Sequence, residues 1–472
     1  MIKCSFFITK ILLLIFTFFV LNLSAQEVIF PSIISDHAVF QRNADVKLWG
    51  WCPSVWNVKI VCSWAPTDTV YTKPDKYSLW KAIIKTPNNV GPHTIRFYGW
   101  ENKLFKEITD VVLGEVWLCS GQSNMEYCFR WRVADGGNDI EQLKHNNNIR
   151  IFKVPKSTSR TPLERVDGKW EIATPESLLD FSVAGFFFGN KLFQSLRCPV
   201  GLIGAYWGGT PIQTWIDSQT LAQNQSFIKN SEKIEANWAP TGNSCLYNAM
   251  VYPIIPYTMK GVVWYQGESN NEQYNEYADL FESMILGWRK QSQQDLPFYF
   301  VQIAPWSGYA DNNGALLREQ QMKVNNKVHS TGMVCVGDLV NDIHDIHPAL
   351  KRQVGERLGN MALYKTYKMT NISPFSPVYR FSQIIGKKIY ISTTAKKLKC
   401  KSSKIKHFQI MDSTGHLFDA DAKLLKDGRI CVVSSHVQHP SAVRYCFTND
   451  AMPDLFDENG LPLMPFRTDN QE

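Results

Sequence analysis

The sequence lacks any cysteine pattern of a metal site. Its 11 cysteines include no Cys-x-x-Cys pair, so metal binding of that kind is not predicted, and no disulfide pairing follows from their spacing. Cys119 and Cys335 lie in apolar, strand-like runs and are expected to be buried free thiols. Internal repeats and low-complexity tracts are also missing, which excludes a repeat architecture.

Charge is modest, and long apolar runs are missing beyond the N-terminus. Charged residues make up 20% and hydrophobic residues 44% of the chain, which is typical of a globular protein and not of a disordered one. The net charge is +7 with the basic residues scattered, apart from a lysine-rich run at 396–406. We read that run as a solvated face, so nucleic-acid binding is not predicted. Aromatic residues are plentiful, with 15 Trp, and favour packing between β-sheets over a sugar-binding surface.

The N-terminus has the pattern of a targeting segment. Lys3 and Lys10 supply positive charge, residues 11–20 are continuously apolar, and small residues end at Ala25. This pattern predicts a secretory signal peptide over 1–25, cleaved near Ala25, and a secreted or periplasmic protein with no stable membrane anchor after cleavage. The alternative is an uncleaved anchor helix, for which the apolar run is short.

The succession of strand and helix patterns along the chain predicts three domains after the signal peptide. Residues 26–110 contain short alternating runs separated by turn residues, as in an antiparallel β-sandwich. Residues 111–365 alternate apolar strands with amphipathic helices, and residues 366–472 return to β-strands. Repeated β–α alternation predicts a parallel sheet covered by helices on both faces. The predicted fold class is therefore α/β, a three-layer α/β/α domain flanked by N- and C-terminal β-sandwich-like domains.

Polar clusters follow the strands of the central domain. They are Gly-Gln-Ser-Asn at 121–124, Gly-Gly at 208–209, Gln-Gly-Glu-Ser-Asn at 266–270 and the Asp- and His-rich segment 342–348. In a parallel sheet such loops emerge at one edge, so residues distant in sequence meet there. Together they supply a hydroxyl, glycine backbone donors, a side-chain amide, carboxylates and an imidazole. Those groups are the parts of an acyl transfer through a serine ester.

The chemistry suggests a role for each residue. Ser123 is the predicted nucleophile and requires a base, for which His347 is preferred over His344 because Pro348 fixes its turn. The base in turn needs a carboxylate to orient it, and Asp345 and Glu268 remain alternatives.

Negative charge on the substrate carbonyl oxygen requires donors. We expect the backbone N–H groups of Ser123 and Gly209 and the side-chain amide of Gln266 to form this oxyanion hole. No metal ion or organic cofactor is predicted.

At these residues the chain resembles the SGNH (GDSL-type) hydrolases, and within them the sialate O-acetylesterase family. The resemblance rests on Gly-Glu-Val-Trp-Leu-Cys-Ser-Gly-Gln-Ser-Asn-Met at 114–125, Gly-Gly-Thr-Pro at 208–211 with Trp215, Trp-Tyr-Gln-Gly-Glu-Ser-Asn at 264–270 and Asp-Ile-His-Pro at 345–348. It extends to Phe-Gln-Arg at 40–42 and to residues 460–468, and so covers nearly the whole mature chain. The combination is highly specific.

The resemblance implies an SGNH central domain that removes acetyl groups from sugar hydroxyls, with Ser123 as nucleophile and His347 as base. The implied substrates are O-acetylated sialic acids; an acetylated xylan or other hemicellulose is the alternative, and a non-catalytic carbohydrate-binding protein is a third reading. Candidate substrate contacts are Asn124, Gln213, Trp215 and Asn270.

The chain departs from the family pattern at three positions. Gln122 stands where many SGNH enzymes have Asp, His344 stands where many have the triad Asp, and Gln213 stands where relatives often have Glu. The second departure leaves the orienting carboxylate open between Glu268 and Asp345.

Overall fold

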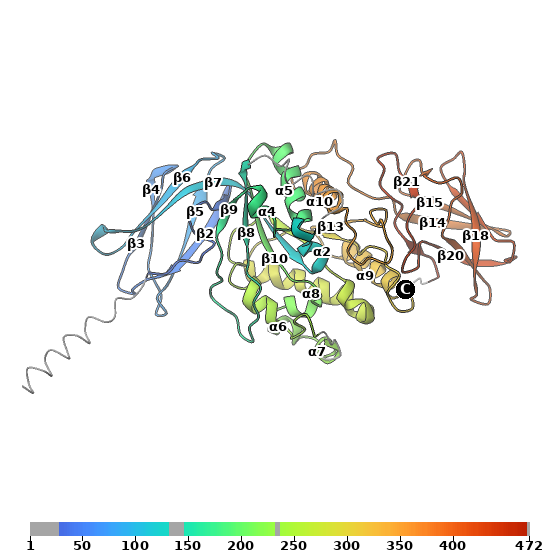
Figure 1. Ribbon diagram of the computed structural model, residues 1–472, viewed down its shortest axis with the longest axis horizontal. Helices are drawn as coiled ribbons and strands as arrows, with labels where there is room; N and C mark the ends of the chain where they lie inside the picture. The colour runs from blue at the N-terminus through green and yellow to red at the C-terminus, as the bar shows by residue number, and fades with distance from the viewer. Residues whose placement is uncertain (1–27, 132–145, 232–236, 470–472) are drawn as a thin grey trace, which may run out of the picture.

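The computed structural model describes residues 28–131, 146–231 and 237–469, and Figure 1 shows them as three parts in a row. A β-rich part precedes the central α/β part, and a second β-rich part follows it. The predicted signal peptide, residues 1–25, lies outside the described residues. Across the ranges that the structure describes, no helix has the length and apolar character needed to span a membrane.

The N-terminal part is built from antiparallel strands, as predicted. Strand β2 (Ala44–Trp51) pairs with β5 (Leu79–Thr86), while β3 (Val58–Cys62) lies between β4 (Ala65–Thr72) and β6 (His93–Tyr98). Every second residue of β5 is buried, from Trp80 to Thr86, because successive side chains of a strand point to opposite faces.

Strand β7 (Leu104–Gly121) runs through the expected boundary at residue 110. Its first half pairs antiparallel with β6, and its second half pairs parallel with β10 (Val200–Tyr206) and β11 (Gly261–Tyr265). The short strand β1 (Val39–Gln41) also pairs with it in parallel. One 18-residue strand therefore belongs to both parts and brings the segment that follows it, with Ser123, to the sheet edge.

The central sheet has the strand order β13-β12-β11-β7-β10-β8-β9. The pairs from β13 to β8 are parallel, and β9 joins the edge antiparallel. The remaining bounds are β8 (Asn146–Lys153), β9 (Trp170–Ala173), β12 (Phe298–Val301) and β13 (Thr331–Val334). The predicted α/β class with a parallel sheet is confirmed.

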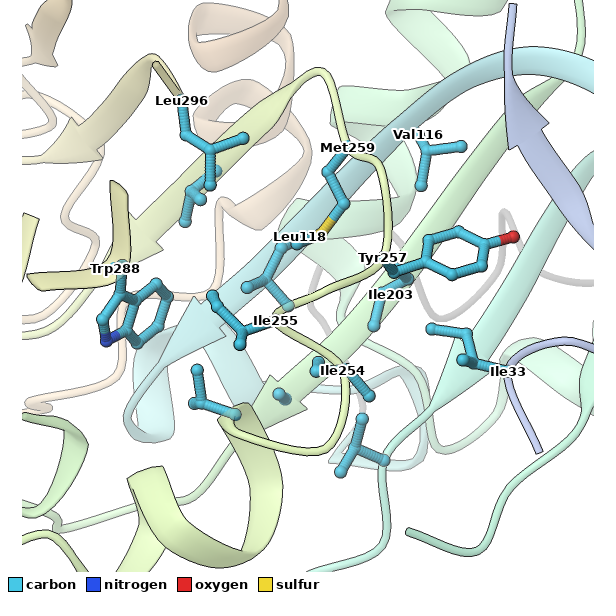
Figure 2. Packing of buried hydrophobic residues seen from close by; sticks show 14 of the residues in the cluster. Ile33, Val116, Leu118, Ile203, Ile254, Ile255, Tyr257, Met259, Trp288 and Leu296 are labelled. Atoms are coloured by element: carbon cyan, nitrogen blue, oxygen red, sulfur yellow. The ribbon is translucent and has the colours of Figure 1, made fainter. Parts of the chain in front are cut away.

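Two cores form because neighbouring residues of β7 face opposite sides of the sheet. Val116 and Leu118 pack in one core with Trp288 of α8 (Tyr274–Ser292), as Figure 2 shows. Trp117 and Cys119 pack in the other core with residues of α5 (Val183–Leu196) and α10 (Lys351–Lys365). Helices thus cover both faces of the sheet, with α9 (Asn313–Lys327) beside α8. Cys119 and Cys335 are buried free thiols, as expected.

Shorter helical segments carry the loops. They are α2 (Ser123–Glu126), α4 (Pro175–Leu178), α6 (Ser218–Leu221), α7 (Gln225–Ser231), η1 (Trp100–Asn102), η2 (Phe129–Trp131), η3 (Ile212–Trp215), η4 (Tyr247–Val251) and η5 (Glu268–Gln273). Helix α10 begins at Lys351, so Pro348 belongs to the loop that carries His347.

The C-terminal part is one seven-stranded antiparallel sheet and not the two stacked sheets of a sandwich. Its strands follow the order β14 (Tyr379–Ile385), β15 (Lys388–Thr393), β19 (Ile430–Val433), β18 (Leu417–Leu424), β17 (Phe408–Asp412), β20 (Pro440–Tyr445) and β22 (Phe466–Arg467). Strands β16 (Lys399–Cys400) and β21 (Leu455–Phe456) form a separate pair. Residues from across the sheet, such as Ile391, Ile410 and Tyr445, share one core, because the sheet curves around its own buried face.

Candidate active site

Ser123 is the first residue of α2, immediately beyond the end of β7. The turn requires glycine at 121, where φ is +138° and a Cβ would lie 2.1 Å from the carbonyl oxygen of Tyr265. The backbone N–H of Gln122 donates to that same carbonyl over 3.0 Å. The ends of β7 and β11 are therefore held close together beside Ser123.

The Gly208-Gly209 loop packs against Ser123. A Cβ on Gly208 would lie 3.2 Å from Cβ of Ser123, and the N–H of Gly208 donates to Oε2 of Glu126 over 2.7 Å. Glu126 also forms a 2.5 Å ion pair with Lys156. Gly209 has φ +73°, and within the described residues its N–H and that of Ser123 have no recorded acceptor. These two N–H groups remain available to an oxyanion.

Gln122 connects the segment 121–124, to which it belongs, with the segment 266–270. Its Oε1 accepts hydrogen bonds from the backbone N–H groups of Gly267 and Ser269, over 3.3 and 3.2 Å. An amide oxygen therefore fills the position where many related enzymes have Asp, and it does so as an acceptor for the Gln-Gly-Glu loop.

Gln266 is not placed as an oxyanion donor. Its side chain is fully buried, and its Nε2 donates to the carbonyl of Thr210 over 3.2 Å and to Oδ1 of Asn270 over 2.8 Å. Its Oε1 accepts from the hydroxyl of Tyr277. Both ends of the Gln266 amide therefore bind other protein groups and connect segment 266–270 with the loop that contains Thr210. This differs from the expectation that Gln266 donates to the oxyanion.

The four expected substrate contacts are also buried, with no exposed surface. Asn270 donates to Oε1 of Gln213 over 2.9 Å, and the indole N–H of Trp215 donates to the hydroxyl of Thr210 over 3.0 Å. These buried side chains therefore support the loops from the protein interior. A sugar on the surface does not reach any of the four, which are Asn124, Gln213, Trp215 and Asn270. Sequence position alone does not distinguish a brace from a contact.

Asn124 connects three parts of the site. Its Nδ2 donates to Oε1 of Glu268 over 2.5 Å and to the carbonyl of Ile346 over 3.0 Å, and its Oδ1 accepts from Nζ of Lys351 over 2.8 Å. Lys351 also donates to the carbonyl of Pro348. Both charged side chains are almost wholly buried. Burial raises the pKa of Glu268 and lowers that of Lys351, while the opposite charge of each partner acts against both shifts.

Sequence reasoning missed Lys351. The available signal was a lysine four residues after the candidate base, on a helix that packs against the sheet. A charged residue at the start of a helix is ordinarily exposed, so nothing in the local pattern predicted that this one is buried.

His347 lies at the mouth of the site, partly covered by aromatic rings. The ring centres of Tyr127 and Trp131 lie 6.4 and 6.3 Å from that of the imidazole. Burial and the positive charge of Lys351 lower the pKa of His347, against the opposing effect of Asp345. The imidazole is therefore neutral at neutral pH, as a general base requires. No hydrogen bond between Ser123 and His347 is recorded in the described ranges.

The two candidate carboxylates differ in their relation to His347. Oδ1 of Asp345 lies 3.9 Å from Nδ1 of the imidazole, beyond hydrogen-bond distance, and accepts the backbone N–H of His347 over 2.8 Å. Glu268 instead binds Asn124. His344, the alternative base, is exposed, and its Nδ1 is 2.8 Å from the hydroxyl of Ser307.

Exposed tryptophans frame the site. Trp238 is 74% exposed, and a Cβ on Gly209 would lie 1.9 Å from its ring, so the indole lies directly against that glycine. Trp131 is 42% exposed on the His347 side, and Trp207 lies beneath Nζ of Lys156. In the described ranges, no group of three or more His, Cys, Asp or Glu side chains is arranged to hold a metal ion.

The chain is similar to known carbohydrate esterases over most of its length. Residues 113–364 match the family model for carbohydrate esterases described as sialic acid-specific acetylesterases. A carbohydrate acetylesterase from Xanthomonas citri is 30% identical, with a TM-score of 0.84 over 94% of this chain and 100% of that one. The sialate O-acetylesterase of Homo sapiens is 27% identical over 399 residues, 77% of this chain and 76% of that protein. The mouse enzyme is 28% identical over 418 residues, 76% of this chain and 77% of that protein.

Proposed function

Because this chain belongs to the sialic acid-specific acetylesterase family of carbohydrate esterases, we propose that it removes O-acetyl groups from sugars, with sialic acids as the leading substrates. It is a carboxylic ester hydrolase. The single observation that carries the mechanism is that the Gly208-Gly209 loop packs against Ser123 while Asn124, the next residue, binds the carbonyl of Ile346 directly before His347. The order of these loops also supports an SGNH-type central domain.

The reaction proceeds in two halves. Oγ of Ser123 attacks the acetyl carbonyl while His347 takes its proton, and the N–H groups of Ser123 and Gly209 stabilise the oxyanion. The sugar oxygen leaves with the proton from His347, which gives the free sugar hydroxyl and an acetyl-serine. Water, deprotonated by His347, then attacks the carbonyl of the acetyl-serine. The bond to Oγ breaks, acetate leaves, and Oγ of Ser123 takes the proton back from His347. The Ser123–His347 hydrogen bond is expected to form when substrate closes the site, as is common for catalytic pairs.

Asp345 is the carboxylate that we assign to the base. It is nearer to His347 than any other carboxylate with a recorded contact in the described ranges, and its charge favours the imidazolium that forms during attack. Its distance of 3.9 Å makes this a weaker partnership than a hydrogen-bonded triad.

The sugar is expected to rest on the exposed tryptophans at the rim. Trp238 covers Gly209, the proposed oxyanion donor, and offers a large apolar face to water. Aromatic faces of this kind stack on the apolar faces of sugar rings. Trp238 therefore replaces the buried residues that sequence suggested as substrate contacts.

The decisive experiment compares the wild type with Ser123→Ala. Acetate release is measured from O-acetylated sialic acids and acetylated xylo-oligosaccharides, with 4-nitrophenyl acetate as a small reference ester. We expect the variant to lose activity on all three while its thermal unfolding is unchanged. Equal, measurable rates in both proteins would refute the serine mechanism, whereas no release above the uncatalysed rate by either protein would favour a non-catalytic sugar-binding protein. Faster release from the xylo-oligosaccharides would favour the hemicellulose alternative.

Export is a separate proposal, based on Lys3, Lys10 and the apolar run at 11–20. The intact mass of the protein purified from its native host should correspond to a chain that begins near Gln26. A full-length mass with Met1 retained would contradict cleavage.

A further inference from the structure

We propose that Lys351 and Asn124 form a buried clamp that holds His347 in register with Ser123, and that Glu268 is the counter-charge of this clamp and not the carboxylate behind the base. The proposal rests on the assignment of Ser123 and His347 as nucleophile and base. It adds two positioning residues to that reaction.

The clamp holds the chain on both sides of the base. Nδ2 of Asn124 donates to the carbonyl of Ile346 over 3.0 Å, one residue before His347. Nζ of Lys351 donates to the carbonyl of Pro348, one residue after it. The carbonyl groups of the residues on either side of His347 are therefore both bound by buried donors.

The same clamp is attached to the nucleophile. Asn124 directly follows Ser123, and its Oδ1 accepts a hydrogen bond from the Lys351 ammonium over 2.8 Å. Because an ammonium only donates, it forces the amide of Asn124 to turn its oxygen toward Lys351 and its nitrogen toward Ile346. Removing the ammonium would leave this amide free to rotate and the base loop free to shift relative to Ser123.

Glu268 supplies the compensating negative charge. Its Oε1 accepts from Asn124 over 2.5 Å, and its Oε2 is buried with no recorded partner in the described ranges. A buried lysine without an opposite charge is strongly disfavoured, so the ammonium, amide and carboxylate form one compensated unit. The positive charge of Lys351 also acts on the base, because it lowers the pKa of His347.

Other groups around Lys351 fit this assignment. The ammonium lies 4.8 and 5.7 Å from the ring centres of Tyr127 and Tyr265, which favour a cation. The titratable or charged groups that face Lys351 or His347 are Glu268, Asp345, Glu126, Tyr127 and Tyr265. None of them replaces the two hydrogen bonds that Lys351 donates.

The test begins with Lys351→Met, which keeps the length of the side chain and removes its charge and donors. Hydrolysis of 4-nitrophenyl acetate should lose about 10²-fold in kcat with KM changed little, as is typical when a catalytic group is misplaced by about 1 Å. The acid limb of the pH–kcat/KM profile should move to higher pH, because the charge that lowers the pKa of His347 is gone. Lys365→Met is the matched control: this lysine of the same helix donates to the carbonyl of Thr331, and its removal should leave kcat unchanged.

A double variant separates positioning from stability. Glu268→Gln combined with Lys351→Met removes both buried charges, so its thermal midpoint should exceed that expected from adding the two single effects. We expect kcat to stay as low as in Lys351→Met, since the two donated hydrogen bonds are still missing. Recovery of kcat together with stability would overturn the positioning role, and so would full kcat or an unmoved acid limb in Lys351→Met.

Glu268→Gln alone tests the counter-charge role. The Gln side chain keeps an acceptor for Asn124, so kcat should fall less than in Lys351→Met. A loss of about 10⁴-fold, as for a true triad carboxylate, would show that Glu268 orients the base and would overturn this part of the proposal. Ser123→Ala must be inactive in the same assay. If it is active, the serine mechanism itself fails, whereas a failed clamp leaves dependence on Ser123 intact.

Discussion

Nδ1 of His347 lies 3.9 Å from Oδ1 of Asp345, while the backbone N–H of His347 donates to the same oxygen over 2.8 Å. Asp345 thus holds the backbone of the base more tightly than its imidazole. The carboxylate is more than half exposed, and solvent weakens its effect on the ring.

This relationship predicts a small effect of Asp345→Asn. The Asn side chain retains an acceptor for the backbone N–H, and only the screened charge is lost. We expect kcat/KM on 4-nitrophenyl acetate to fall by about fivefold or less, the equivalent of about 1 kcal/mol for an exposed pair. Asp342→Asn is the matched control, because Asp342 accepts the backbone N–H of His344 in the same way. A loss of several hundredfold would instead identify Asp345 as a full triad member.

The pH dependence of the enzyme follows from the environment of His347. Burial, followed by the charge of Lys351, lowers the pKa of the imidazole from its usual 6.5. The base acts when neutral, so activity should rise with pH through a midpoint below 6.5 and be fully developed at neutral pH. Measuring kcat/KM between about pH 4 and 8 checks this, using the imidazole reference value. A midpoint above that reference would contradict the described environment.

Asp345→Asn offers a second check on the sign. The aspartate charge raises the pKa of His347, so its removal should move the acid limb to lower pH, opposite to the shift expected for Lys351→Met. Shifts of both acid limbs in the same direction would contradict one of the two assignments.

Trp238→Ala should weaken sugar binding selectively. We expect KM for an O-acetylated sugar to rise roughly fivefold, since an aromatic contact contributes about 1 kcal/mol. The rate on 4-nitrophenyl acetate, which has no sugar ring, should change less than twofold by the same reasoning. Trp100→Ala, a comparably exposed tryptophan of η1, serves as the control and should change neither. Equal losses on both esters would show that Trp238 supports the Gly209 loop and does not contact the sugar.

The C-terminal sheet is fastened to the central domain through Asn449. Its Nδ2 donates to the carbonyls of Tyr309 and Asp311, each over 2.8 Å, and its Oδ1 accepts from Gly314 over 2.9 Å. Asn449→Ala should lower the free energy of unfolding by about 2–3 kcal/mol, because buried polar groups lose their partners. Urea unfolding measures this, with the exposed Asn459→Ala expected to change it by less than about 0.5 kcal/mol.

Local pattern was sufficient for much of the fold. The short alternating runs before residue 110 correspond to antiparallel strands, and the alternation of apolar strands with amphipathic helices after it corresponds to the parallel sheet and its helices. Strand β4 was missed because its residues are largely exposed and lack a clear apolar alternation. Strand β9, at the edge of the central sheet, and its neighbour β8 were missed as well.

The sequence by itself determined which side chains meet at the sheet edge. Ser123, Gly209, Glu268 and His347 each follow a strand, and parallel strands bring such loops together whatever their separation along the chain. That inference requires only the alternation of strands and helices.

Only the tertiary structure decided what those side chains do there. Burial, which local sequence does not encode, makes supports of Asn124, expected as a substrate contact, and of Gln266, expected as an oxyanion donor, and it encloses Lys351. It also placed Trp238 from a distant loop on Gly209. The physical reason is that a role depends on exposure and on which partner already occupies each donor and acceptor, and both arise from contacts between segments far apart in the chain.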